Sequence, residues 1–74
     1  MNNTITFEGN RVSVSSSGNV ERFEFTVTTA RKITRSGARS IGQVHGMGGQ
    51  DFSCDESKED GLYIYKCNAT CYCD

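Results

Sequence analysis

The strongest constraint on this chain is Val20–Thr29, a ten-residue stretch in which polar and apolar side chains alternate from position 22 to position 28. Phe23, Phe25 and Val27 fall on alternate positions, with charged or hydroxyl-bearing residues between them. Because successive side chains of a β-strand point to opposite faces, this pattern predicts a strand with one buried and one solvated face. The phenylalanine, valine and threonine content favours the same structure. A strand of this kind needs partners, so we expect a mainly β fold.

Two shorter alternating runs precede that strand, residues 4–8 and 11–15, with Gly9-Asn10 between them. Two alternating runs joined by a glycine–asparagine pair are typical of a β-hairpin. The serine-rich segment 15–19 has the composition of a turn. Together with the longer strand, these runs predict a three-stranded antiparallel meander.

Residues 30–50 allow two interpretations. Their apolar residues fit a helical stripe, and Arg31, Arg35 and Arg39 recur every four positions, as on one face of a helix. Three glycines oppose a helix, because each costs about 1 kcal/mol in a helix interior. These are Gly37, Gly42 and Gly46. The balance favours β or irregular structure, and the alternative is one short helix within residues 30–45.

The rest of the chain is polar until its last apolar run. Residues 45–50 are expected to form a flexible loop and residues 51–61 a solvated acidic loop. The run that begins at Leu62 predicts the final strand, on which Tyr65 and Cys67 share one face with a tyrosine two residues earlier. Both faces of this strand are partly apolar, which favours a central or covered position.

These elements predict one domain over residues 1–74, a small antiparallel sheet of four to six strands. A chain of 74 residues buries only about 60% of the surface that its unfolded form exposes. A core of that size needs support from disulfides, a metal or oligomerisation. We therefore expect the sheet to be stapled near its C-terminus by cysteines.

Four cysteines follow the spacing C-x12-C-x3-C-x-C, at Cys54, Cys67, Cys71 and Cys73. All four are disulfide candidates, and Cys54 is expected to pair into the C-terminal cluster. In a straight strand Cys67 and Cys71 would lie ~13 Å apart, so pairing them requires a bend at residues 68–70. Four thiolates also suit zinc, with His45 able to replace one of them. The third alternative is that the thiols stay reduced.

The sequence argues against an enzyme. A nucleophilic thiolate needs a positioned base, and the one histidine, His45, lies in a glycine-rich segment that would not hold it still. The glycines at 46, 48 and 49 lack the lysine and the strand–loop–helix setting of a phosphate loop. We predict no catalytic or cofactor-binding residue, and zinc is the only cofactor under consideration.

Charge is unevenly spread along the chain. Residues 31–50 carry four cations and no acid, whereas residues 51–74 carry six acids and two lysines. The predicted function is a non-enzymatic binding or regulatory module that docks a protein partner, with a basic contact surface made by Arg31, Lys32, Arg35 and Arg39. Nucleic acid is less favoured, because four cations neutralise few phosphates and no aromatic residue lies among them. Self-association through the acidic end is also open.

A third function is considered besides the binding module and the zinc protein. Gly48-Gly49 precedes a cysteine-rich tail, as in a precursor cut after a double glycine to release residues 50–74. The N-terminus has neither the basic segment nor the apolar segment of a secretory signal, so a cytoplasmic location is expected. No apolar run approaches the ~20 residues of a membrane span, and no membrane association is expected.

Overall fold

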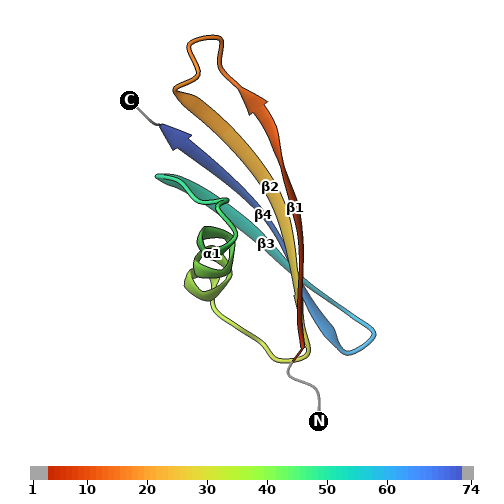
Figure 1. Ribbon diagram of the computed structural model, residues 1–74. Coiled ribbons are helices and arrows are strands. Elements are labelled where there is room, and N and C mark those ends of the chain that lie inside the picture. Colours follow the sequence, from red (N-terminus) through yellow and green to blue (C-terminus); the bar gives the residue numbers. More distant parts are fainter. Residues whose placement is uncertain (1–3, 73–74) are drawn as a thin grey trace.

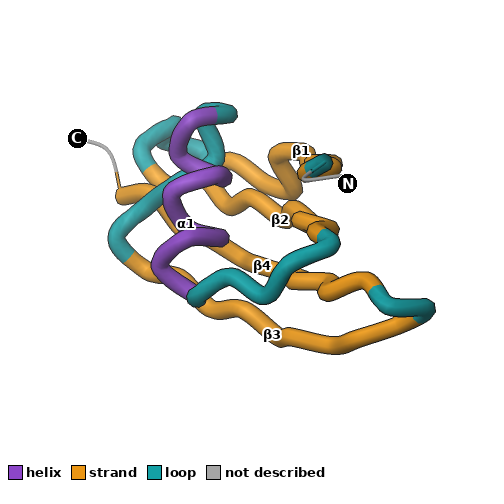
Figure 2. Tube along the Cα trace, turned by 90° about the horizontal axis from the view of Figure 1, so that it is seen from below, coloured by secondary structure: helices purple, strands orange, loops and turns teal. Residues whose placement is uncertain are grey.

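The computed structural model describes residues 4–72. These residues form four strands and one helix: β1 (Ile5–Val14), β2 (Val20–Thr29), α1 (Arg35–Val44), β3 (Asp51–Glu59) and β4 (Leu62–Tyr72). The strands make one antiparallel sheet in the order β1-β2-β4-β3. The helix crosses one face of this sheet and leaves the other face open (Figures 1 and 2). The prediction of a mainly β, antiparallel domain with one short helix is confirmed.

The last strand of the chain, β4, is a central strand of the sheet. It pairs with β2 on one side, where Phe25 lies opposite Cys67 and Val27 opposite Tyr65. It pairs with β3 on the other side. The predicted strand from Leu62, with Tyr65 and Cys67 on one face, is therefore confirmed.

The predicted hairpin at Gly9-Asn10 is wrong, because β1 runs through both residues as one strand. Gly9 lies opposite Phe25, and a Cβ atom on Gly9 would lie 2.5 Å from the Cβ of Phe25. The glycine thus permits a close approach rather than a turn. The register of β1 shifts between Arg11 and Ser13, a β-bulge that bends its second half.

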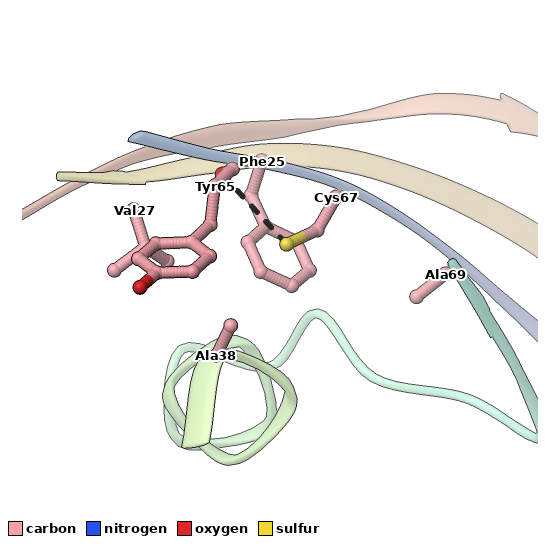
Figure 3. Packing of buried hydrophobic residues seen from close by; sticks show 6 residues of the cluster. All are labelled: Phe25, Val27, Ala38, Tyr65, Cys67 and Ala69. Carbon is pink, nitrogen blue, oxygen red and sulfur yellow. Dashed lines mark hydrogen bonds between the residues drawn. The ribbon is translucent and has the colours of Figure 1, made fainter. Parts of the chain in front are cut away.

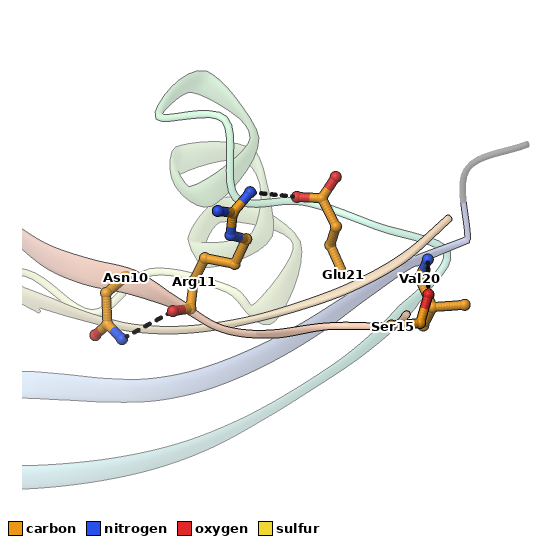
Figure 4. Close-up of polar contacts among 5 residues, drawn as sticks. All are labelled: Asn10, Arg11, Ser15, Val20 and Glu21. Carbon is orange, nitrogen blue, oxygen red and sulfur yellow. Dashed lines mark hydrogen bonds and ion pairs between the residues drawn. The ribbon is translucent and has the colours of Figure 1, made fainter. Parts of the chain in front are cut away.

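The first turn of the chain is the serine-rich segment, as predicted. Ser15 accepts a hydrogen bond through Oγ from the backbone N–H of Val20 at 3.1 Å (Figure 4). Beside this turn, Arg11 of β1 and Glu21 of β2 form an ion pair at 3.5 Å. Figure 4 shows both side chains on the side of the sheet that carries the helix.

The preferred β interpretation of residues 30–50 is wrong, and the helical alternative is confirmed. Thr34 caps the N-terminus of α1, where its Oγ1 accepts from the N–H of Gly37 at 2.9 Å. At the other end, Gly46 has a φ of 79°. The N–H of Met47 then bonds to the carbonyl of Gly42 at 2.7 Å. This is a Schellman motif, so the segment expected to be a flexible loop begins with a defined helix stop.

The glycines that opposed a helix in the sequence include one that the packing requires. Gly42 faces the sheet, and a Cβ atom there would lie 2.3 Å from Cζ of Phe25. Ala38, one turn earlier, is completely buried. These small residues bring α1 close to β2 and β4.

No helix within residues 4–72 has the length and apolar character that crossing a membrane requires.

The acidic segment predicted as a loop is the edge strand β3, so that prediction is also wrong. Asp60 and Gly61 join β3 to β4 with φ angles of 53° and 78°. Two positive φ values are the signature of a type I′ turn, which suits the twist of a hairpin. The charged residues of β3 face water along the sheet edge, and such charges discourage pairing with another chain.

The core lies between the sheet and α1. It consists of Phe25, Val27, Ala38, Tyr65, Cys67 and Ala69, all nearly inaccessible to solvent (Figure 3). Tyr65 also holds the segment that leads into the helix: its hydroxyl accepts from Ile33 N–H at 2.9 Å and donates to Ile33 O at 3.1 Å. A single buried side chain therefore satisfies both backbone groups of Ile33 and fixes where α1 begins.

Candidate functional site

Two of the four candidate cysteines lie side by side, Cys67 in the core and Cys54 at its edge. Cys54 on β3 and Cys67 on β4 are direct register partners. Their Sγ atoms are 2.9 Å apart, and the thiol of Cys67 donates to that of Cys54. A disulfide requires a sulfur–sulfur distance of about 2.05 Å, so this pair consists of two thiols. The expected neighbour of Cys54 is thus found in Cys67, although the two are not at disulfide distance.

The two thiols have different surroundings. Cys67 is 2% exposed and lies on the central strand, between Phe25 and Ala69 in Figure 3. Cys54 is half-buried and lies on the edge strand. Burial raises the pKa of the Cys67 thiol well above its usual range, and the hydrogen bond to Cys54 acts in the same direction. Cys67 therefore stays protonated at neutral pH, while Cys54 is the more accessible thiol.

Of the remaining cysteine candidates, Cys71 is not brought to this pair. Cys71 is half-buried on the same face of β4 as Cys67, opposite Glu21 of β2. Because β4 is extended through residues 68–70, the bend that pairing of Cys67 with Cys71 would require is not formed. Cys73 lies outside the described residues.

His45 lies on a different part of the molecule. Its ring stacks on Phe7 of β1, with centroids 3.9 Å apart and planes at 4°. Within residues 4–72, no three histidine, cysteine, aspartate or glutamate side chains are grouped so that they could hold a metal ion. The zinc alternative therefore stays a prediction that rests on the sequence alone.

The four cations of the predicted contact surface have unequal roles. Arg39 is half-buried on α1, and its Nη2 donates to the carbonyl of Gly49 at 2.8 Å. Its guanidinium also lies 5.8 Å from the ring centroid of Phe52. Arg39 thus connects the helix to the segment that enters β3, which is a structural role.

The other three cations are exposed. Arg31 and Lys32 precede the helix, and Arg35 is its first residue. Lys32 Nζ lies 4.0 Å from Oε2 of Glu56, with both side chains largely solvated. Such an exposed pair is worth little energetically, so Lys32 can exchange it for another carboxylate. We refer to Arg31, Lys32 and Arg35 as the basic rim.

A small apolar crevice adjoins the basic rim. Its volume is about 200 Å³, and its lining consists of Thr4, Ile5, Thr29, Ala30, Arg31 and Ile33. Ile5 is 50% exposed here, which leaves apolar surface open to solvent. Pockets for small molecules usually span roughly 300–1,000 Å³. The crevice is smaller, and its size suits a single side chain.

The open face of the sheet has the opposite charge. Alternate strand positions place seven charged side chains there. They are Glu8, Glu24, Asp51, Asp55 and Glu59 against Arg22 and Lys66. A shallow depression of about 650 Å³ lies among some of them. The molecule therefore has a basic side, which carries the helix, and an acidic side, which is the open face.

Sequence reasoning missed two features of these sites. The crevice combines residues from β1 and from the segment before α1, and no local pattern reveals that contact. The pairing of Cys54 with Cys67, in contrast, had a signal. Asp60-Gly61 is a strong type I′ turn sequence, and a two-residue turn there places position 54 opposite position 67.

No protein family, curated protein or solved structure matches this chain.

Proposed function

We propose that this protein is a non-enzymatic binding module that docks an acidic segment of a protein partner. The observation that carries the proposal is the apolar crevice beside the basic rim. A partner would insert one apolar side chain between Ile5 and Ile33. Carboxylates flanking that side chain would face Arg31 and Arg35.

The two parts of this surface supply different contributions. Buried apolar anchors provide most of the affinity at protein interfaces, because they are desolvated in well-packed pockets. Exposed charges chiefly steer association and select the partner. The acidic open face repels acidic segments, while the helix side attracts them. The charge distribution thus orients an acidic partner toward the crevice.

The first turn of α1 supports the same partner chemistry. Arg35 lies there without any acidic neighbour in that turn. The positive end of the helix dipole adds to its charge, and both favour a carboxylate. A partner carboxylate would supply the negative charge that this turn lacks.

Selection from phage-displayed random peptides tests the proposal. We expect enriched peptides to carry acidic residues around one apolar residue. The double variant Arg31→Glu with Arg35→Glu should weaken their binding at least tenfold, since it reverses two charges of the basic rim. The matched control, Arg22→Glu with Lys66→Glu, makes the same change in net charge on the open face and should keep the affinity within about twofold.

Three outcomes would contradict this function. Equal loss of binding in both double variants would mean that net charge alone matters. Tighter binding of a single-stranded DNA oligonucleotide, measured by fluorescence anisotropy, would favour a nucleic-acid partner. Concentration-dependent dimers in sedimentation velocity, abolished by the Arg31 and Arg35 changes, would mean that the surface joins two copies of this chain.

We also propose that the predicted staple is a disulfide between Cys54 and Cys67, formed under oxidising conditions. Direct register opposition and the 2.9 Å contact support this pairing over one with Cys71. The bridge would tie the edge strand β3 to the central strand β4. Its formation would raise the stability of this half of the sheet, and that change would be its regulatory effect. Intact mass tests it, because a bridge removes two hydrogen atoms.

A further inference from the structure

The two thiols of the Cys54–Cys67 pair differ in their accessibility to solvent. Cys54 lies on β3, which has a neighbouring strand on one side only, and its side chain is partly accessible. Cys67 is 2% exposed, between β2 and β3 and beneath the helix. A dissolved reagent can therefore reach Cys54 but not Cys67. This asymmetry is the arrangement that stepwise thiol exchange requires.

We propose that Cys54 and Cys67 form a thiol–disulfide exchange site for a low-molecular-weight disulfide of the glutathione type. Cys54 is the attacking thiol and Cys67 is the resolving thiol. The inference rests on the proposed Cys54–Cys67 bridge and is independent of partner docking.

The reaction balances in two steps. The Cys54 thiolate attacks one sulfur of oxidised glutathione, a new sulfur–sulfur bond forms, and one glutathione leaves as its thiolate. Cys67, whose Sγ lies 2.9 Å from Sγ of Cys54 in the reduced pair, gives its proton to the first departing glutathione thiolate and attacks Sγ of Cys54 as a thiolate. The second glutathione leaves as a thiolate and takes up the proton that Cys54 released. The protein loses two electrons and two hydrogens, and one glutathione disulfide becomes two glutathione thiols.

Strand geometry makes the bridge reversible. Directly opposed residues of an antiparallel pair have Cβ atoms about 4.5–5.5 Å apart. Disulfides prefer about 3.5–4.5 Å, so a bridge between directly opposed strand positions generally draws the two strands together. Strained bridges have higher reduction potentials and are the readily exchanged kind. Excess thiol should therefore reopen this one.

The experiment uses the full chain with Cys71→Ser and Cys73→Ser, so that only the pair can react. After incubation with oxidised glutathione and alkylation of the remaining thiols, intact mass is measured. We expect loss of two hydrogens and no retained glutathione. Adding Cys67→Ser should stop the reaction with one glutathione on residue 54. Adding Cys54→Ser should leave Cys67 almost unmodified. Its rate of glutathione uptake should be at least tenfold below the rate at Cys54.

Peptide mapping of the oxidised wild-type chain keeps the test independent of how the variants fold. A peptide pair crosslinked through Cys54 and Cys67 supports the proposal. If no crosslink between these two residues forms in either experiment, both the bridge and the exchange site are overturned. If the crosslink forms but Cys67 takes up glutathione as fast as Cys54, the bridge stands and the assigned order of attack is overturned.

Discussion

At the scale of single residues, two arginines one helical turn apart show how position decides role. Arg35 is exposed at the start of α1, whereas Arg39 is half-buried and bonded to the carbonyl of Gly49. The Nε atom of Arg39 is buried without a hydrogen-bond partner among the described residues. The sequence presents both as members of one basic stripe. The fold gives Arg39 a structural role and leaves Arg35 exposed.

Charge reversal at the two arginines should therefore have opposite effects on stability. Arg39→Glu removes a charged hydrogen bond and the stacking on Phe52, so we expect a loss of about 2–3 kcal/mol in the free energy of unfolding. Arg35→Glu places a carboxylate at the helix N-terminus and should stabilise by roughly 0.3–1 kcal/mol. Urea denaturation followed by circular dichroism measures both. Equal stability of the two variants would remove the structural role of Arg39.

At the scale of elements, the helix is defined by small residues that a propensity scale counts against it. Gly42 lies against the ring of Phe25, while Gly37 lies in the first turn beside Thr34. An added Cβ at Gly37 would come no closer than 3.4 Å to its neighbours, an ordinary contact. Both glycines therefore lower the intrinsic stability of the helix equally. Only Gly42 is required for the packing of the helix against the sheet.

This difference predicts opposite signs for the same substitution. Gly37→Ala should stabilise the protein by up to about 1 kcal/mol, because alanine is the better helix former. Gly42→Ala should destabilise it by about 1–3 kcal/mol, because the new methyl group overpacks against Phe25 and the carbonyl of Met47. Thermal unfolding of both variants is the measurement. If Gly42→Ala raised the melting temperature as Gly37→Ala does, the close helix packing would be wrong.

At the scale of the whole molecule, the sheet is assembled from distant parts of the chain. β4 pairs with β2 across the centre, so the C-terminal hairpin completes a sheet that the N-terminal hairpin begins. Release of residues 50–74 after Gly48-Gly49 would remove β3 and β4. It would leave one two-stranded hairpin, which is marginally stable at best. The precursor hypothesis stays a prediction that rests on the sequence alone.

The buried thiol of Cys67 makes the stability of the whole reduced molecule depend on pH. An unfolded-chain thiol has its ordinary pKa of 9.0, whereas burial raises the pKa of folded Cys67. Above pH 9 the unfolded state therefore binds fewer protons than the folded state, and the free energy of unfolding falls as pH rises. The contribution of the protonated Cys67 thiol to the free energy of unfolding is complete below pH 9. Above pH 9 it decreases by up to about 1.4 kcal/mol per pH unit.

Urea denaturation in reducing buffer, from pH 8 upward, measures this slope, and Cys67→Ala supplies the control. At pH 8 the variant should have a lower free energy of unfolding than the wild type. As the pH rises, its free energy of unfolding should fall less steeply. Other alkaline groups are shared and cancel, including Tyr72, whose pKa is raised by its hydrogen bond to Asp51. Parallel slopes for the two proteins would show that Cys67 ionises as easily in the folded state as in the unfolded one.

Local patterns predicted the elements whose side chains alternate or repeat. The strand Val20–Thr29 and the start of β4 at Leu62 agree with the sequence, as does the serine-rich turn. The local patterns fail at Gly9, which suggests a turn but permits close contact with Phe25. They also fail at β3, because both its faces are largely polar and resemble a loop.

By itself, the sequence determined that this protein is a small, mainly β domain with cysteines near its C-terminus, because alternation and turn chemistry act within a few residues of chain. Tertiary structure alone decided that Cys54 meets Cys67 beneath the helix and that Arg39 bonds to the carbonyl of Gly49. It also decided that Ile5 and Ile33 enclose a crevice beside the remaining cations. These outcomes depend on strand order and helix docking, which bring together residues that no local pattern relates.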